Sequence, residues 1–511
     1  MNSGDRHLRP LPDGPPVIPV TGSKAVLVQA TGEHSRSVAG QHFLQMLVNL
    51  LARQYGVVDK IFLDVPSSES RDGVFPLRVN AGPLPERLLS LASDVAGPEI
   101  EVGYWNSGSI SPVAEDKLAV IRLGAFDTTI GSECDISVAA DGWRFGCSTV
   151  STLDTPASSS ANPIGPYMAA CFAASAVFRY FIGQNPRTEI VYSIWQGTEG
   201  RWPELQGGTS FGELVLPPVY MIGTGAVGTA AAFTLAASRG IRGQLILIDP
   251  KKSSRTNKNR LLSTRYTDAE KPKVLLAADL FSESQIQCFA YQGPWPDYTI
   301  DASRRTPNEI VAMERKDRYE WVLSCVERNH QRRSIALLYP RNVLGGSTNG
   351  MRAQVAYYSM EGACQCLGCD HPTPRRPSVE ELCDELRTMS QEQRRGWYFR
   401  YGVGEREISA IEEYVQDPDC GKAGAHELGL LASNGEVDWS VGFVSVASGV
   451  LLVASLIRVL VGRQDFLHDG SEFHAWFLKP SLAQHFAKRK SDCDICGSPA
   501  KQVRFHEIWR P

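Results

Sequence analysis

The chain is 511 residues long, with 43% hydrophobic residues, 21% charged residues and a formal net charge of −4. This composition is that of an ordinary globular protein and excludes wholesale disorder, a collagen-like repeat and a small disulfide-stapled scaffold. The balance of charges also lacks the basic field that nucleic-acid-binding proteins carry. At about 150 residues per domain, the length predicts two to four domains.

The first 200 residues predict an α/β domain that follows a nucleotide-binding plan without its glycine motif. No secretory signal is readable at the N-terminus, and twelve cysteines are too few for a secreted framework, so we expect a cytoplasmic protein. Residues 25–66 have the pattern strand, turn, helix, strand, ending near Asp64. The turn offers Gly32 and Gly40 but lacks the G-x-G-x-x-G spacing.

The clearest strand–turn–helix unit of the chain begins at Val219. A short apolar run leads into Gly223, Gly225 and Gly228, and a helical stretch follows that should end at Gly240. A second apolar run then ends at Asp249. Further strands are expected at 321–327 and 351–360. Together these segments predict a doubly wound α/β sheet.

Residues 162–183 and 441–462 indicate that the chain contains a repeat. Each segment is a run of small apolar residues with an arginine, Arg179 or Arg458, four residues before a final glycine. The second segment is long enough to span a membrane, but its serines and internal arginine favour a buried core helix. We therefore predict two Rossmann-like halves that form an internal pseudo-dimer; two unrelated Rossmann-like domains are the alternative. The predicted domains are an inactive half at 1–200, an ATP-binding half at 201–362, an inserted segment at 363–440 and a C-terminal part at 441–511.

The residues after Asp249 decide which nucleotide chemistry the second half favours. Asp249 lies 21 residues past Gly228, where a ribose ligand belongs, and a nicotinamide enzyme would share this feature. However, the downstream segment is dense in polar and cationic side chains, which suit a triphosphate that loses pyrophosphate: Asn257, Asn259, Arg260 and Lys273. Glu327 at a later strand end is a candidate ligand for a divalent cation. A solvated surface loop is the alternative interpretation of the charges.

Two C-x-x-C motifs predict a metal site. Cys366 and Cys369 form the first, and Cys493 and Cys496 form the second, 123 residues further on. Four thiolates at this local spacing make a closed tetrahedral zinc site with a structural role. Cys364 can replace Cys366 through a register shift, and a redox pair is the weaker alternative.

In combination, the motifs resemble the adenylation domain of the ubiquitin-activating-enzyme superfamily, which includes ThiF and MoeB. The residues that carry the resemblance are IGTGAVG, Asp249, the N-K-N-R run at 257–260, KPK at 271–273 and SCVERNHQRR at 324–333. The resemblance implies ATP and Mg²⁺ as cofactors, with Asp249 on the ribose. Asn257, Arg260 and Lys273 would contact the phosphates, Arg260 and Lys273 as catalytic residues, and Asn259 would also belong to the nucleotide site. Glu327 would stand at the magnesium position, and Arg332 follows it. The resemblance also implies an inactive first half and the distant zinc pair. Lys251 and Glu327 depart from the family pattern, which has aspartates there.

The resemblance further implies a thioester-forming cysteine in the inserted segment. Cys383 lies in an acidic helical stretch that disfavours a thiolate, whereas Cys420 precedes a predicted helix and Lys422, so Cys420 is preferred over Cys383 and Cys364. The predicted function is activation of a ubiquitin-like protein at its C-terminal glycine, as in bacterial conjugation and defence operons. A conjugating-enzyme-like protein would be the second partner, and further homodimerisation is left open. The alternatives are adenylation alone for sulfur transfer or peptide modification, a non-catalytic nucleotide-binding scaffold, and a nicotinamide oxidoreductase.

Overall fold

The computed structural model describes most of the chain, and the element bounds below follow it. The described residues are 21–105, 117–127, 130–304, 318–361, 364–371, 379–401, 403–416, 441–463 and 471–510, together with positions 19, 424, 427 and 428. The chain divides into two compact units. One consists of Ile18–Pro372 and Val441–Pro511, and the other includes Thr373–Ser440.

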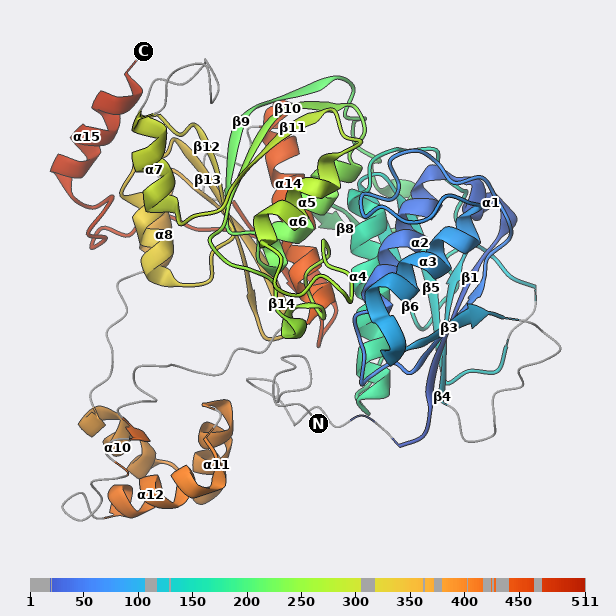
Figure 1. Cartoon of the computed structure of the whole chain (residues 1–511), viewed down its shortest axis with the longest axis horizontal. Helices are drawn as coiled ribbons and strands as arrows, with labels where there is room; N and C mark the ends of the chain where they lie inside the picture. The colour runs from blue at the N-terminus through green and yellow to red at the C-terminus, as the bar shows by residue number, and fades with distance from the viewer. Residues whose placement is uncertain are drawn as a thin grey trace. The chain divides into compact units, whose positions relative to one another are not determined.

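The larger unit contains two eight-stranded mixed sheets, one from each half of the chain (Figure 1). The first sheet has the order β3-β2-β1-β4-β5-β6-β7-β8. Its strands are β1 (Lys24–Ala30), β2 (Lys60–Asp64), β3 (Glu101–Tyr104), β4 (Lys117–Leu123), β5 (Cys134–Asp141), β6 (Arg144–Ser148), β7 (Glu189–Ser193) and β8 (Thr198–Glu199). Strands β1 to β5 pair in parallel, and β5 to β8 pair antiparallel.

The second sheet repeats this plan strand for strand, in the order β11-β10-β9-β12-β13-β14-β15-β16. Its strands are β9 (Leu214–Ile222), β10 (Ile241–Ile248), β11 (Ile286–Tyr291), β12 (Trp321–Ser324), β13 (Asn342–Asn349), β14 (Arg352–Tyr358), β15 (Ser471–Trp476) and β16 (Ser481–Phe486). The change from parallel to antiparallel pairing comes at β13, the counterpart of β5. The predicted repeat of two Rossmann-like halves is therefore confirmed.

Helices cover the two sheets in corresponding positions. The first half carries α1 (Gly32–Arg36), α2 (Val38–Leu51), α3 (Leu84–Ala96) and α4 (Ile164–Phe181). The second half carries α5 (Ala226–Ala237), α6 (Lys273–Ala278), α7 (Trp295–Arg304), α8 (Asn329–Ala336), α9 (Leu367–Asp370), α14 (Gly442–Leu460) and α15 (Pro499–Trp509). Helices α4 and α14 occupy equivalent places, each just before the seventh strand of its sheet.

The two halves meet through their long apolar helices. Helix α14 packs against α4 of the first half and against α5 and the sheet of its own half (Figure 1). The rings of Phe178 and Phe443 lie 5.6 Å apart, edge to face, across this contact. A Cβ at Gly449 would lie 2.5 Å from the Cβ of Ala230, so glycine allows α14 to approach α5 closely.

Helix α14 is also the one helix in the described part of the chain that is long and apolar enough to cross a membrane. However, 83% of its most apolar stretch is buried inside the structure. The buried core helix predicted at 441–462 is confirmed.

The smaller unit has a hydrophobic core of its own. Its helices are α10 (Val379–Thr388), α11 (Gln391–Arg400) and α12 (Glu405–Gln416). Leu386, Trp397 and Ile411 are buried together in this core, and the Cys383 thiol lies with them. The predicted division of the chain at residues 200, 362 and 440 stays a prediction.

Candidate nucleotide site and cysteine cluster

The glycine loop of the second half follows β9, whose parallel neighbour β12 ends beside it. Gly223 has a φ of +94°, which favours glycine, and a Cβ there would lie 2.8 Å from the carbonyl oxygen of Cys325. A Cβ at Gly228 would lie 1.9 Å from the Gly223 carbonyl oxygen, so this glycine lets α5 pack on the loop. Nothing lies within 4 Å of the place where a Cβ of Gly225 would stand, which leaves room for a phosphate to approach.

Asp249 ties the end of β10 to this loop. One carboxylate oxygen accepts a hydrogen bond from the Thr224 backbone N–H, and the other accepts from the Lys251 backbone N–H, both at 2.7 Å. Asp249 is therefore a structural anchor of the loop. Because a carboxylate has about four lone-pair positions, it retains acceptor capacity for a ribose hydroxyl.

A pocket of about 320 Å³ opens at the carboxyl ends of β9, β10 and β12. Its wall brings together five of the residues predicted for the nucleotide, which come from four separate segments: Gly223, Gly225, Asp249, Lys273 and Glu327. Such a crevice at the point where strand order reverses is where open α/β sheets bind ligands. Lys273 is the first residue of helix α6 and belongs to the same lining.

Two further groups, Cys325 in the pocket wall and Arg332 on α8, lie near Glu327. Arg332 on α8 is largely buried, and its Nε donates to the carbonyl oxygen of Val326 at 2.9 Å, next to Glu327. Burial lowers the pKa of Arg332 and raises that of Cys325, which also lines the pocket, to about 12. The raised pKa favours the neutral thiol of Cys325 over the thiolate, which is the nucleophilic form of a cysteine.

The remaining predicted residues lie outside the pocket wall. Asn257 forms a capping box with Ser254, in which its side-chain oxygen accepts from the Ser254 N–H. The Arg260 guanidinium is buried and donates to the Thr256 carbonyl oxygen and the Asn259 side-chain oxygen, both at 2.8 Å. The phosphate roles of Asn257, Asn259 and Arg260 stay a prediction.

Sequence reasoning missed Trp295 and His330, which also line the pocket. Trp295 begins helix α7 after β11, and its ring is packed in an aromatic cluster with Tyr298 and Tyr319. No spacing rule marks such a residue in advance. The Pro294–Trp295–Pro296 run was the available signal, because prolines commonly flank the start of a helix.

The corresponding place in the first half is built differently. An additional short helix, α1, separates β1 from α2, and the N-cap residue of α2 is Ser37, where α5 has Gly225. Side chains pack over the strand ends: a Cβ at Gly124, just after β4, would lie 2.7 Å from His34 Nδ1 and 2.8 Å from Thr31 Cγ2. An open depression next to Arg36 and Ser37 includes no strand-end residue in its lining.

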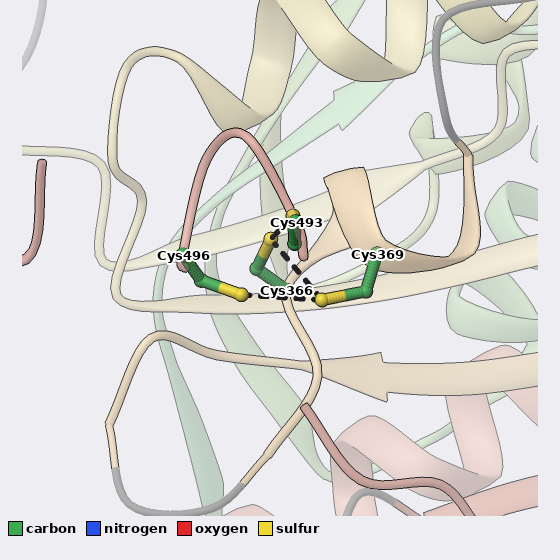
Figure 2. A group of neighbouring side chains, drawn as sticks. All are labelled: Cys366, Cys369, Cys493 and Cys496. Atoms are coloured by element: carbon green, nitrogen blue, oxygen red, sulfur yellow. Dashed lines mark hydrogen bonds between the residues drawn. The ribbon is translucent and has the colours of Figure 1, made fainter. Parts of the chain in front are cut away.

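The four cysteines of the C-x-x-C motifs come together beside α8. The sulfurs face one another in Figure 2, and all four lie within 4.8 Å of one another. The Sγ–Sγ separations are 3.8 Å for Cys366–Cys369, 3.7 Å for Cys366–Cys493 and 3.2 Å for Cys369–Cys496. Zn–S bonds of about 2.3 Å in a tetrahedron put sulfurs about 3.8 Å apart, so the group fits zinc.

Contacts around the cysteines link this cluster to the pocket. Asp494, inside the second motif, forms an ion pair with Arg333 on α8, and Arg332 on the same helix contacts the ring of His371. The cluster therefore supports the helix that follows Glu327. Cys364, the alternative ligand, is buried but does not belong to the group.

Of the three candidate thioester cysteines, the structure describes Cys364 and Cys383. Cys420, together with Lys422, lies outside the described residues. Cys383 is buried in the core of the inserted helices, and burial raises its pKa. Cys364 is also buried. A buried thiol is shielded from a macromolecular partner, so neither Cys383 nor Cys364 is placed to accept an acyl group in this conformation.

The fold and the site together define a protein of two Rossmann-like halves, with a nucleotide-type pocket in the second half and a four-cysteine cluster beside it. The ThiF family model matches residues 215–495, and the model of the BilD N-terminal domain matches residues 26–189. Because the first match covers more than half of the chain, the chain belongs to the ThiF family.

Individual relatives are distant. The chain is 25% identical over 287 residues to the uncharacterized protein y4jF of Sinorhizobium fredii (strain NBRC 101917 / NGR234), covering 54% of this chain and 49% of that protein. It is 26% identical over 200 residues to the bacterial E1-like protein BilD of Collimonas sp. (strain OK412), covering 37% and 42%. The chain thus spans about half the length of the curated relatives it matches.

Solved structures with a similar fold include E. coli MccB with ATP and selenomethionine-labelled PaaA. The MccB structure has a TM-score of 0.36 and 15% identity, covering 55% of this chain and 66% of its own. The PaaA structure has a TM-score of 0.32 and 15% identity, covering 54% and 65%.

Proposed function

We propose that the protein is an ATP-dependent activating enzyme for a ubiquitin-like protein. It would adenylate the C-terminal glycine of that partner and then transfer the acyl group to Cys420. The observation that carries the adenylation step is the pocket in the ThiF-family half, where the glycine loop, Asp249, Lys273 and Glu327 share one wall. The likeness to a bacterial E1-like protein supports a protein partner.

Each of these residues would have a specific role in the adenylation reaction. A partner carboxylate oxygen attacks the α-phosphorus of ATP, the bond to pyrophosphate breaks, and charge builds on the phosphoryl oxygens. Lys273 would neutralise that charge, and Asp249 would orient the ribose while holding the loop. Glu327 would hold Mg²⁺, and the ion would supply charge neutralisation of the departing pyrophosphate.

The thioester step would use Cys420 of the inserted segment. Its thiolate attacks the acyl carbon, the bond to AMP breaks, and the thiol proton passes to solvent. The burial of Cys383 and Cys364 supports Cys420 by leaving it the better candidate among the three. A conjugating-enzyme-like protein would then receive the acyl group.

We further propose that the four-cysteine cluster holds one structural zinc ion. Four deprotonated sulfurs would occupy every ligand position, so the ion takes no part in the reaction. Its role would be to hold the two C-x-x-C motifs against α8. Metal analysis of the purified chain should find one zinc per chain, and substitution of Cys366→Ser should remove it.

The test of the activity combines pyrophosphate exchange with mass spectrometry of the intact protein. The probe is a candidate ubiquitin-like protein ending in glycine from the gene neighbourhood, with Mg²⁺ and ATP. We expect exchange and an adduct sensitive to dithiothreitol. The Lys273→Ala variant should lose both, with exchange falling about 10²–10³-fold. The Cys420→Ala variant should keep exchange and lose the adduct, whereas the matched control Cys383→Ser should keep both.

The outcomes separate the alternatives. A full adduct in Cys420→Ala would show that the thioester assignment is wrong. Exchange without any adduct would leave adenylation alone, for sulfur transfer or peptide modification. ATP binding without exchange would indicate a non-catalytic nucleotide-binding scaffold, and a spectral change on titration with NADH would indicate an oxidoreductase.

A further inference from the structure

Arg53, at the end of helix α2 in the first half, reaches across into the second half. It is 2% exposed, and its guanidinium donates to a segment about 200 residues away in the sequence. One terminal nitrogen donates to the Lys258 carbonyl oxygen at 2.6 Å and to the Thr264 hydroxyl at 3.3 Å. The other donates to the carbonyl oxygens of Leu262 at 3.1 Å and Thr264 at 2.9 Å.

The guanidinium is itself held in place from its own helix. Arg53 Nε donates to the Asn49 side-chain oxygen at 2.8 Å, one helical turn earlier, and Asn49 is fully buried. The planar fork of arginine can bind several carbonyl oxygens at once, whereas the ammonium group of lysine cannot match that geometry. The bonds made by Arg53 therefore fix both the position and the direction of the segment that it contacts.

Further contacts hold the same segment against the first half. The Lys258 ammonium forms an ion pair with Glu99 and lies 4.3 Å from the ring centre of Tyr55. The backbone N–H of Tyr266 donates to the Asp94 carbonyl oxygen at 2.8 Å. Residues 258–266 are thus attached to the first half along their length.

This segment begins within the predicted phosphate-contacting run of the second half, Asn257 to Arg260. It also precedes Lys271–Lys273, which leads to the pocket wall, and the backbone of 251–253 bonds to 270–273. A displacement of the segment therefore moves both the Asn257–Arg260 run and the residues that lead to Lys273. Errors of about 1 Å in such positions reduce rates by as much as 10²-fold.

We infer that Arg53 is a positioning residue for the nucleotide site: the first half holds the phosphate-binding segment of the second half through this side chain. Arg53 would then contribute to ATP affinity without touching ATP. The effect on affinity rests on the proposed function, whereas the ordering of the segment does not.

Arg179 provides a matched control. It is 2% exposed at the end of α4, and its guanidinium also donates to carbonyl oxygens, those of Asn185, Pro186 and Arg187, at 3.0–3.2 Å. All these partners lie within the first half. Arg179→Lys should therefore destabilise the protein as Arg53→Lys does, without reaching residues 258–266.

The first measurement is amide hydrogen exchange of the full-length chain, at a temperature where thermal melting shows both variants to be folded. Arg53→Lys should raise exchange across 257–266 about tenfold or more relative to wild type, while Arg179→Lys leaves these amides unchanged. Asn49→Ala, which loosens Arg53 without contacting the segment, should act in the same direction with a smaller effect. If Arg53→Lys does not fold, Asn49→Ala serves as the test in its place.

The second measurement is calorimetric titration with Mg-ATP. We expect the Kd to rise about tenfold in Arg53→Lys and less than about twofold in Arg179→Lys. Unchanged exchange across 257–266 in both Arg53→Lys and Asn49→Ala would overturn the inference. Equal changes in Kd for the two lysine variants would overturn it as well. If the wild-type protein binds no Mg-ATP, the proposed function fails, and hydrogen exchange alone decides the role of Arg53.

Discussion

The two halves share one topology but differ at the position where a nucleotide would lie. In the second half, β9 passes into α5 through Gly223 and Gly225, and the space next to Gly225 is open. In the first half, helix α1 is inserted at this point, Ser37 caps α2 by accepting from the Gly40 N–H at 3.0 Å, and His34 and Thr31 pack over the strand ends.

The difference teaches that one topology can leave the space at its strand ends open in one half and fill it with side chains in the other. In the first half α2 packs closely on α1, since a Cβ at Gly40 would lie 2.1 Å from the His34 carbonyl oxygen. The first half also has a buried polar stripe that runs along α2 and just past its end, where α5 is almost entirely apolar: His42, Gln45, Asn49 and Arg53. At its end, this stripe supplies the contact with the second half.

Changing Gly225→Ser should have the largest effect on nucleotide binding, because it gives the second half the helix cap of the first. The new side chain would occupy the open space needed for a phosphate, and we expect the Kd for Mg-ATP to rise about 10²-fold. Calorimetric titration measures this. The matched change Ser37→Gly should lower the free energy of unfolding by only a few tenths of a kcal/mol and leave ATP binding unaltered. Wild-type affinity in Gly225→Ser would show that the open space is not the decisive difference between the halves.

Removing the charge of Asp249 should have an intermediate effect. In Asp249→Asn, one of the two backbone N–H donors, Thr224 or Lys251, would face an amide NH₂ group, so the loop loses a charge-assisted bond and we expect about tenfold weaker Mg-ATP binding. Asp64→Asn is the counterpart in the first half. Asp64 accepts from the Gln29 side chain at 2.8 Å, and an asparagine oxygen can still do so. Titration should therefore give the wild-type Kd for Mg-ATP in Asp64→Asn. An equal loss of ATP affinity in Asp249→Asn and Asp64→Asn would show that the two carboxylates do not differ in their contribution to ATP binding.

The same contrast between the halves should appear in stability when Gly223→Ala is compared with Gly32→Ala. At φ +94° an alanine is strained, and its Cβ would press on the Cys325 carbonyl, so we expect a loss of about 1–3 kcal/mol in the free energy of unfolding. A Cβ at Gly32 meets first the end of the flexible Arg36 side chain, at 3.3 Å. That variant should stay within about 0.5 kcal/mol of wild type. Denaturant titration of both would test the contrast, which similar losses would contradict.

Local patterns predicted a large part of the fold and the site. The glycine spacing at 223–228 and the carboxylate at Asp249 follow from the geometry of a strand–turn–helix unit, which involves residues close in the sequence. The similarity of 162–183 to 441–462 predicted the repeat, because each segment is the apolar helix that its half must bury. The C-x-x-C motifs predicted their own grouping, since two local pairs of thiols need only one long-range contact to form a cluster.

The remaining features depend on contacts that no local pattern encodes. Trp295 and His330 come from α7 and α8, which follow β11 and β12, and in the sheet β10 and β9 lie between these two strands. Only the strand order of the folded sheet therefore brings both residues to one pocket. In the sequence, Arg53 looks like an ordinary charged residue at a helix end. In the structure it is buried and donates to carbonyl oxygens of residues about 200 positions further along the chain. Backbone carbonyls are present in every residue, so a sequence carries no sign of which ones a buried guanidinium will bind.

The sequence by itself determined that the chain holds two copies of one nucleotide-binding plan, a complete glycine motif in one copy only and a four-cysteine site. These properties can be recognised from residue types at short spacings, because such spacings reflect the local geometry of the backbone. Only the tertiary structure decided that Asp249, Lys273 and Glu327 share one wall, that Cys383 and Cys364 are buried, and that the first half holds the segment after Asn257. Each of these depends on which distant surfaces pack together, and the close packing of the whole core determines that.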